Sequence, residues 1–481
     1  MERNSLLVDP ETQVQGNKSG YRTFGSKNDS TRGSRQASLR DSMRQLGRST
    51  RNSIQDSLRF GGRQVSVRDL GGTSTITKSS FNLIKNIVGA GVLALPAGVA
   101  SFADSPSAVI PAAGWVCAMG LAFAYSFQLI AKTCKMTQSV TFREVWEETM
   151  GYDGALTVSM VNMLKPALGN LAYSMILADT FKALFATAGF ETTRILSLLL
   201  VTILGILPLC LLKNLDALAP FSILGTAGIF LIAVCMTIRY FDGTYDVEND
   251  GVFLQDLDEK YIPQFGNYNG AWTGAVLIFA AMLFESFVAH YNAPRFMAEL
   301  KNSNIHRFRI VVGNAFIFSS LVYVWMTAIG FLTFGGNCNG YILNNYSTND
   351  RLATICRLSI AFSILFTYPI TFMGFRDGVL DAIDLPQEKQ TSSNINIITI
   401  FLLTIITILA AICTDLGAIN AIGGGTLATL IVFVFPYLMY RKAVGENPTI
   451  EERREVSFAL LLMLVGVLMG IVGVVVELHH L

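Results

Sequence analysis

Apolar residues in this chain gather into long blocks that are separated by short polar stretches. A helix needs about 20 consecutive apolar residues to cross the hydrocarbon layer of a membrane, and each block is long enough or nearly so. The pattern therefore predicts an all-α polytopic membrane protein with about 11 transmembrane helices. The predicted spans cover residues 79–101, 106–131, 154–187, 194–213, 217–240, 271–294, 309–334, 352–384, 395–414, 416–440 and 456–478.

The first block, 79–101, is interrupted in its middle. Polar residues come first (Asn82, Lys85 and Asn86), and the apolar run that follows is then broken by Gly89, Gly91, Pro96 and Gly98. Unwound backbone exposes N–H and C=O groups that lipid cannot satisfy, so it survives only where it faces protein, water or a solute. Broken helices of this kind form the midplane solute sites of secondary transporters. The alternative is an ordinary membrane helix whose glycines allow close packing.

Composition divides the chain into two parts. Hydrophobic residues make up 51% of the 481 residues and charged residues only 15%, which is too apolar for a soluble protein. Residues 1–78 hold 14 Lys or Arg against 7 Asp or Glu, so this polar segment carries +7 and the remainder −6. Such a composition cannot bury a core. We expect a disordered, basic, Ser/Arg-rich cytosolic tail at residues 1–78 and a transmembrane domain at residues 79–478.

Charges in the loops predict how the helices are oriented. The loop at 241–270 carries seven acidic residues against Lys260 alone. A cytosolic tail places this loop on the other side of the membrane, in agreement with the positive-inside rule. The sequence 345–347 is an N-glycosylation sequon on that same side. The predicted cytosolic loops contain Lys132, Lys135, Arg143, Lys213, Arg295, Lys301, Arg307, Arg309, Arg441, Lys442, Arg453 and Arg454.

The tail contains two kinds of candidate regulatory motif. Glu2 followed by Leu6 and Leu7 has the acidic dileucine form that adaptor proteins read when they sort cargo to endosomes, lysosomes or vacuoles. Several serines follow arginines at a spacing that kinases use, and phosphorylation would add negative charge beside those arginines. The alternative is a solvated basic tail near anionic lipid. The serines are Ser38, Ser42 and Ser66.

The residues that usually carry catalysis form no constellation here. The cysteines have no metal-binding spacing, and free thiols are expected; the alternative is a single bridge between Cys338 and Cys356 or Cys413 on the non-cytosolic side. No phosphate-binding glycine motif is present, and the glycines at 423–425 indicate close helix contact or local unwinding. We expect no enzyme activity, no metal site, no cofactor beyond a coupling ion and no nucleic-acid partner. The histidines are His290, His306, His479 and His480.

Ionisable residues inside membrane spans are costly, so each is a functional candidate. Glu285 lies in the middle of the sixth span, where a low dielectric favours proton uptake by a carboxyl. It is a candidate for cation coupling, and the alternative is a carboxylate neutralised by Lys85 or Lys165. Lys165 and Asp179 lie 14 residues apart on one helix. That spacing separates them by about 21 Å, so they cannot pair.

Hydroxyl groups in the eighth span offer oxygen ligands for a small cation. Ser363 and Thr367 lie four residues apart, so they share one face of the helix. Hydroxyls on membrane helices also bond back to their own backbone, which is the alternative.

Four stretches together resemble the amino acid/auxin permease family, within the amino acid-polyamine-organocation superfamily. The resemblance covers about residues 77–478. It implies eleven helices, ten of which form a five-plus-five inverted repeat like that of the bacterial leucine transporter, with helices 1 and 6 broken. The stretches are FNLIKNIVGAGVLALP (81–96), ILPLCLLKNLDALAPFSILG (206–225), FVAHYNAPRFMAELKN (287–302) and FTYPITFMGFRDGV (366–379).

The resemblance also implies where solute and cation bind. The backbone of the first break should face the amino and carboxylate groups of an amino acid, because half-helix ends and unwound carbonyls complement those charges. Asn82 and Thr367 fall where sodium-coupled members hold their ion, and Glu285 and Ser363 complete the predicted coupling set. The predicted substrate-binding residues are Asn86, Gly89, Ala90, Gly91, Phe284 and Ser286.

Two features depart from the family pattern. Lys85 stands where sodium-coupled members often have a small or polar residue, and its ammonium would repel Na⁺. The sixth span has no central glycine or proline, so its break is expected at 284–286, and the alternative is that this helix is not broken. We expect a secondary active amino acid transporter that works by alternating access, coupled to H⁺ rather than Na⁺. A vacuolar or lysosomal membrane is favoured over the plasma membrane. The rival is an amino acid sensor on the same fold that signals through its tail.

Overall fold

The computed structural model describes residues 72–152, 154–211, 219–383 and 391–480. Within these ranges the chain is helical, and the only strand-like pairing consists of isolated β-bridges. The sorting motif and the candidate phosphorylation sites lie outside the described residues. The first described helix, α2 (Ile76–Ile87), begins three residues before the predicted start of the first span.

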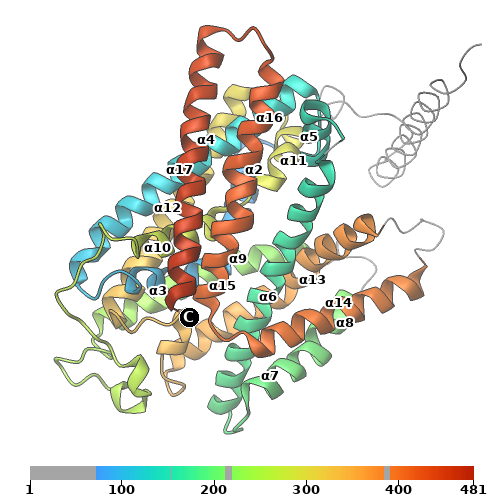
Figure 1. Ribbon diagram of the computed structural model, residues 1–481. Coiled ribbons are helices and arrows are strands. Elements are labelled where there is room, and N and C mark those ends of the chain that lie inside the picture. Colours follow the sequence, from blue (N-terminus) through green and yellow to red (C-terminus); the bar gives the residue numbers. More distant parts are fainter. Residues whose placement is uncertain (1–71, 153, 212–218, 384–390, 481) are drawn as a thin grey trace, which may run out of the picture. The chain divides into compact units, whose positions relative to one another are not determined.

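The helices follow the predicted spans in order (Figure 1). Within the described ranges, seven helices are long and apolar enough to cross a membrane, and the bent pair α2 and α3 makes an eighth. The remaining spans correspond to α6 and to the shorter apolar helices α7–α8 and α9. The amphipathic α5 (Phe142–Met150) lies between spans.

The spans are numbered 1 to 11 below in chain order. They are α2 and α3 (Ile76–Ile87, Leu95–Ala100), α4 (Val109–Thr137), α6 (Ala155–Thr187), α7 and α8 (Arg194–Val201, Leu207–Cys210), α9 (Ala219–Phe241), α10 and α11 (Val276–Phe287, Ala293–Glu299), α12 (Ile305–Phe334), α13 (Arg351–Ala382), α14 (Ser392–Ile412), α15 and α16 (Leu416–Gly423, Phe435–Val444) and α17 (Ile450–His480).

Packing sorts the first nine helices into two groups. Helices 1, 2, 6 and 7 pack on one another, chiefly through α12, which lies against both α2 and α4. Helices 3, 4, 8 and 9 form the second group around the long pair α6 and α13. Helix 5 packs mainly on α13, and helices 10 and 11 pack on α10. We call the first group the bundle and the second the scaffold.

Glycines let helix 10 approach helix 6 backbone to backbone. A Cβ added at Gly424 would lie 1.8 Å from the carbonyl oxygen of Ala281. Gly425 in turn lies against Gly470 of helix 11, where an added Cβ would meet the Gly470 oxygen at 2.7 Å. Residues Gly424–Ala428 also unwind into a π-helix. The prediction of close contact or local unwinding at 423–425 is confirmed, because both occur.

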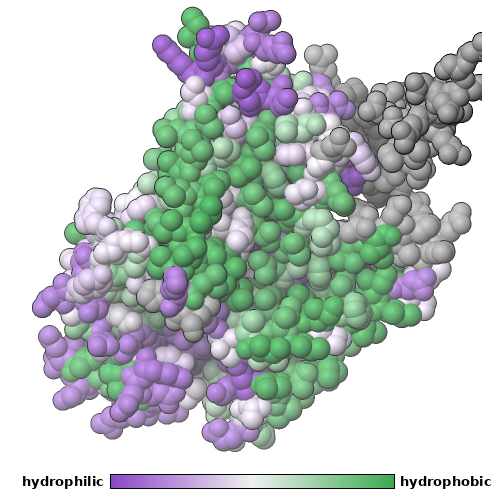
Figure 2. Space-filling view, viewed as in Figure 1, coloured by the Kyte–Doolittle hydropathy of each residue, from purple (hydrophilic) through white to green (hydrophobic). Residues whose placement is uncertain are grey.

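The two ends of the helices differ in charge. The acidic loop that follows α9 lies at the opposite end from the connection between α16 and α17, which is flanked by Arg441 and Arg453 (Figure 1). We call these the acidic end and the basic end. On the face shown in Figure 2, exposed apolar side chains of α17 and α14 lie between hydrophilic residues at the two ends. This band of exposed apolar side chains is what a lipid-facing surface requires.

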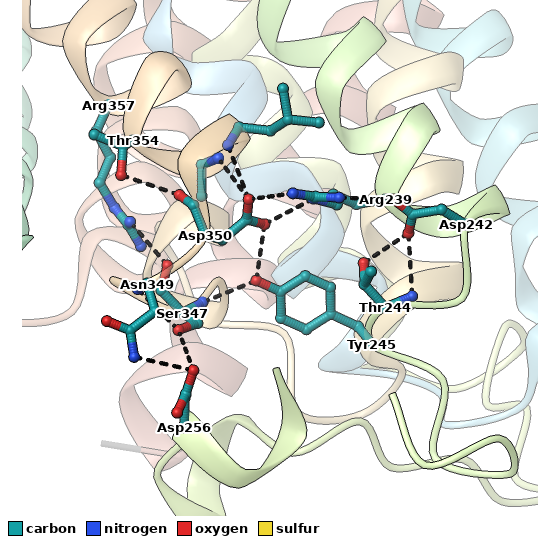
Figure 3. A network of polar contacts seen from close by, with 12 residues as sticks. Arg239, Asp242, Thr244, Tyr245, Asp256, Ser347, Asn349, Asp350, Thr354 and Arg357 are labelled. Carbon is teal, nitrogen blue, oxygen red and sulfur yellow. Dashed lines mark hydrogen bonds and ion pairs between the residues drawn. The ribbon is translucent and has the colours of Figure 1, made fainter. Parts of the chain in front are cut away.

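A buried polar network holds the loops at the acidic end (Figure 3). Asp350, which is fully buried, receives two hydrogen bonds from Arg239, at 2.9 and 2.6 Å, and one from Tyr245 at 3.0 Å. Burial and the charge of Asp350 raise the pKa of Tyr245, so the phenol stays protonated and can donate. Arg357 donates to three loop carbonyls, including that of Ser347. The network ties helices 5 and 8 to the loops between them.

The folded loop makes the glycosylation sequon inaccessible. Asn345 has no exposed surface, and its side-chain amide donates to the carbonyl of Asn337 at 2.8 Å. Ser347 is also buried and donates to Asp256 at 3.1 Å. The expectation of a usable sequon is therefore wrong for the folded protein, because this asparagine is part of the loop's interior. All seven cysteines are free, as expected.

We predict that Gly424→Ala destabilises the protein, because the new methyl group must push helix 10 away from helix 6. Overpacking of this kind costs about 1–3 kcal/mol. Thermal unfolding of the purified protein in detergent measures the loss. Gly313→Ala on α12 is the matched control, because no atom lies within 4 Å of its added Cβ. Equal melting temperatures for the two variants would contradict the packing described here.

Candidate functional site

Helix 1 is broken where the sequence predicts. The helix α2, capped at its start by Thr75, ends at Ile87, and the chain is extended at Val88 and Gly89. The second half bends by 43° from the first. No atom lies within 4 Å of a Cβ added at Gly89, so the backbone there faces open space. The predicted break of helix 1 is confirmed.

Helix 6 is also broken, but not at 284–286. The helix α10 runs without interruption through these residues, and the chain leaves helical geometry at Val288 and Ala289. A helix then restarts at Ala293 with Pro294 in its first turn. Proline is tolerated at that position because its missing N–H would have no partner there. The predicted location was wrong because Pro294, outside the middle of the span, governs the break.

The two breaks lie side by side. A Cβ added at Gly91 would meet the Ser286 hydroxyl oxygen at 3.3 Å, so glycine permits this approach. The Ser286 hydroxyl itself donates back to the carbonyl of Met282 at 2.9 Å. Ala90 is buried behind the break. Three of the predicted substrate-binding residues, Gly89, Gly91 and Ser286, therefore surround one region of unwound backbone.

Two other predicted substrate-binding residues have different surroundings. Asn86 is exposed and accepts a hydrogen bond from the side chain of Asn292 across the two breaks, at 3.4 Å. Phe284 is fully buried among aromatic rings, with centroids 5.6 Å from Phe123 and 5.2 Å from Phe433. Its side chain packs toward helices 2 and 10.

Glu285 forms an ion pair with Lys165, so helix 6 of the bundle is joined to helix 3 of the scaffold. One carboxylate oxygen of Glu285 is buried without a hydrogen-bond partner. Asp179 pairs instead with Arg194 at 2.7 Å, which agrees with the expectation that it cannot reach Lys165. Lys85 is half-buried and has no ion-pair partner among the described residues.

The remaining predicted coupling residues are Ser363, Thr367 and Asn82. Thr367 donates back to the carbonyl of Ser363 at 2.8 Å, which is the alternative considered for these hydroxyls. The Ser363 hydroxyl lies against Gly225 of helix 5, where an added Cβ would come within 2.4 Å of it. Asn82 is half-buried on α2. The part of the chain that the structure describes has no cluster of His, Cys, Asp or Glu fit for a metal ion.

His290, at the break of helix 6, makes a packing hydrogen bond. Its Nε2 lies 3.0 Å from the carbonyl oxygen of Phe123, and its ring is fully buried among phenylalanines. A carbonyl only accepts, so Nε2 carries the proton and Nδ1 keeps a buried lone pair without a partner.

A cavity of about 340 Å³ opens beside the second half of helix 1 and the first half of helix 6. It lies on the acidic-end side of both breaks. Most of the residues that line it are small, and two are acidic, Asp415 of helix 10 and Glu477 of helix 11. Its lining includes Ala97, Ser101, Ile278, Met282 and Gly340.

Comparison with known proteins identifies the family. A profile of the transmembrane amino acid transporter protein family matches residues 72–478. The chain belongs to this family. It is 25% identical over 413 residues to the putative sodium-coupled neutral amino acid transporter 11 of Danio rerio, which covers 84% of this chain and 86% of that protein. It is 24% identical over 381 residues to vacuolar amino acid transporter 2 of Saccharomyces cerevisiae, covering 76% and 75%.

Solved transporters share the fold. The inward-facing conformation of Mhp1 superposes with a TM-score of 0.55 at 12% identity, over 87% of this chain and 91% of that one. The crystal structure of MhsT in complex with L-phenylalanine gives 0.51 at 11% identity, over 86% and 100%. The chain is thus an all-helical, multi-pass membrane protein with the leucine-transporter-like fold, a member of a transporter family and not an enzyme.

Sequence reasoning missed three residues of this site. Tyr323 of α12 donates to backbone carbonyls at both breaks, and Asn292 bridges to Asn86. Pro294 was visible in the sequence and could have located the second break. Tyr323 had only a weak signal, a lone phenol in the middle of an apolar span.

We predict that Lys165→Met and Glu285→Gln each destabilise the protein more than the double variant does. Removing one partner of a buried pair leaves an uncompensated charge, which costs roughly 3–5 kcal/mol. The double variant Lys165→Met/Glu285→Gln removes both charges and should recover part of that loss. Thermal unfolding of the four proteins in detergent completes the cycle. Additive losses would contradict a direct pair.

Proposed function

We propose that this protein is a secondary active transporter that moves amino acids across a membrane by alternating access. The observation that carries the proposal is the pair of adjacent breaks in helices 1 and 6, with open space at Gly89. Unwound carbonyls suit an α-ammonium group, and half-helix N-termini suit an α-carboxylate. Small neutral amino acids are the proposed substrates, because Glu285 already has a partner in Lys165 and, among the described residues, no pair of opposite charges is left at the breaks for a charged side chain.

The division of helices supports rocking as the transport movement. The bundle and the scaffold each pack internally more than across their boundary. The pair Glu285 and Lys165 crosses that boundary. A movement of the bundle against the scaffold would expose the breaks first to one side and then to the other.

We further propose that the coupling ion is H⁺. An ammonium at Lys85, one helical turn from Asn82, disfavours a second cation there. The hydroxyls of helix 8 that would complete a sodium site are directed to their own backbone and to helix 5. Protonation of Glu285 would weaken its bond to Lys165 and so link proton uptake to movement across the boundary. The relative in Danio rerio is named as sodium-coupled, which makes Na⁺ the competing assignment.

An acidic organelle, a vacuole or a lysosome, is the proposed location. The yeast relative is named as a vacuolar transporter, and the dileucine sequence at Leu6 and Leu7 is of the type read for such sorting. A proton gradient across that membrane would provide the driving force.

Uptake into proteoliposomes tests the function. The purified protein is given labelled neutral amino acids under an imposed pH gradient and, separately, under a sodium gradient. We expect uptake with the pH gradient only, and its loss in Glu285→Gln, with Asp377→Asn on the exposed face of helix 8 as the control variant. Uptake driven by sodium and lost in Asn82→Ala or Thr367→Ala would overturn the coupling assignment.

A sensor on the same fold is the second candidate, supported by the long basic tail. Deletion of residues 1–70 separates the two. A transporter retains its flux in proteoliposomes without the tail. Amino acid binding with no flux in the full-length protein under either gradient would favour the sensor.

A further inference from the structure

Tyr323 serves the two helix breaks at once. Each break leaves a carbonyl without the helical N–H that would follow it four residues later: Ile87 in helix 1 and Ser286 in helix 6. The Tyr323 hydroxyl lies 2.8 Å from the oxygen of Ile87 and 2.7 Å from that of Ser286. Tyr323 is fully buried on α12, and its ring packs 4.6 Å from that of Phe287. One phenol has one proton, so the two carbonyls share a single donor.

Two further contacts tie helix 1 to helix 6 between the breaks and the basic end. The side chain of Asn292 donates to that of Asn86 at 3.4 Å. At the basic end the backbone N–H of Ser74 donates to Glu299 at 3.0 Å, and the Ser74 carbonyl accepts from Lys301 at 2.9 Å. This pairing makes a parallel β-bridge between Ser74 and Leu300.

The approach at the basic end requires glycine. A Cβ added at Gly72 would lie 2.6 Å from backbone atoms of both Glu299 and Leu300. The chain therefore enters helix 1 pressed against the end of helix 6. The helix α2 also packs along α12, which carries Tyr323.

We propose that Tyr323 is a positioning residue that fixes both breaks to α12, so that the first half of helix 1 moves with helices 6 and 7 as one body. An independent swing of α2 would break all three ties and leave the Ile87 carbonyl unpaired inside the protein. This inference rests on the proposed transport function, because it says which parts move together during the cycle. It makes Tyr323 part of the substrate site without requiring that it touch the substrate.

A cross-link at the basic end tests the common movement. The β-bridge brings Ser74 and Leu300 to the separation of neighbouring strands, which a disulfide can span. Ser74→Cys/Leu300→Cys is oxidised with copper phenanthroline in proteoliposomes, and cross-linking is read from labelling of free thiols. The wild type and both single variants, with and without oxidant, control for the native cysteines.

If α2 and helix 6 move together, the cross-linked protein keeps its amino acid flux within about twofold of the reduced protein. Loss of flux by tenfold or more on oxidation, regained with reductant, would mean that α2 swings separately and would overturn the proposal. Absence of flux in the wild type would instead reject the transport function itself, so the two failures are distinguishable.

Substitution of Tyr323 tests the positioning role. Tyr323→Phe removes the only shared donor, and the loss of one hydrogen bond to a buried carbonyl predicts a rise in KM of roughly tenfold. Incorporation of 4-aminophenylalanine at position 323 supplies two N–H donors, so KM should return toward the wild-type value. Thermal unfolding of each variant shows whether it is folded. An unchanged KM in a folded Tyr323→Phe protein, or no rescue by the amine, would contradict the role.

Discussion

Backbone groups inside a membrane need partners, and this requirement governs the centre of the molecule. A continuous helix satisfies its own N–H and C=O groups, whereas each broken helix leaves several of them without partners. In this protein the two breaks lie against each other and share the Tyr323 hydroxyl. Gly91 of helix 1 has no side chain, so the chain at the first break can lie close to Ser286 of helix 6. Open space adjoins the first break at Gly89, which is the site proposed for the solute.

The surroundings keep this arrangement in place without closing it. Helix 10 packs closely on helix 6 at Gly424, and helix 11 packs closely on helix 10 at Gly470. At the acidic end, the hydrogen bonds of the buried Asp350 network fix the loops to helices 5 and 8. Between bundle and scaffold, the described contacts include the ion pair of Glu285 with Lys165. Packing is thus dense within each group, and this ion pair is a contact between the groups that the proposed rocking movement would have to accommodate.

Much of the fold could be predicted from local sequence. Block lengths gave the number and order of spans, and the glycines of the first block located the first break. The second break was predicted a few residues too early because the middle of the span holds no glycine or proline to mark it. The residue that governs it, Pro294, lies beyond the break and acts by fixing where the next helix restarts.

Site residues that depend on distant contacts could not be derived in this way. Tyr323 and Ile87 are 236 residues apart, and no local pattern links them. For Glu285 the sequence offered a coupling role and, as the alternative, neutralisation by a lysine such as Lys85 or Lys165; the fold shows the ion pair with Lys165. Asn345 matched a glycosylation sequon by local rule, and its burial depends on how the whole loop closes. Contacts between residues that are far apart in the sequence therefore determine most of the site.

The central claim is that the solute binds at the break of helix 1. It is tested most directly by measuring amino acid binding to a variant with a large side chain at that break. Gly89 has an extended backbone conformation that any residue can adopt, and an added side chain would enter open space. Gly89→Leu should fold normally yet lose amino acid binding, measured by calorimetry on the purified protein. Gly114→Leu, which adds the same side chain on an exposed face of α4, should bind as the wild type does. Undiminished binding by a folded Gly89→Leu protein would show that the solute does not bind at the break of helix 1.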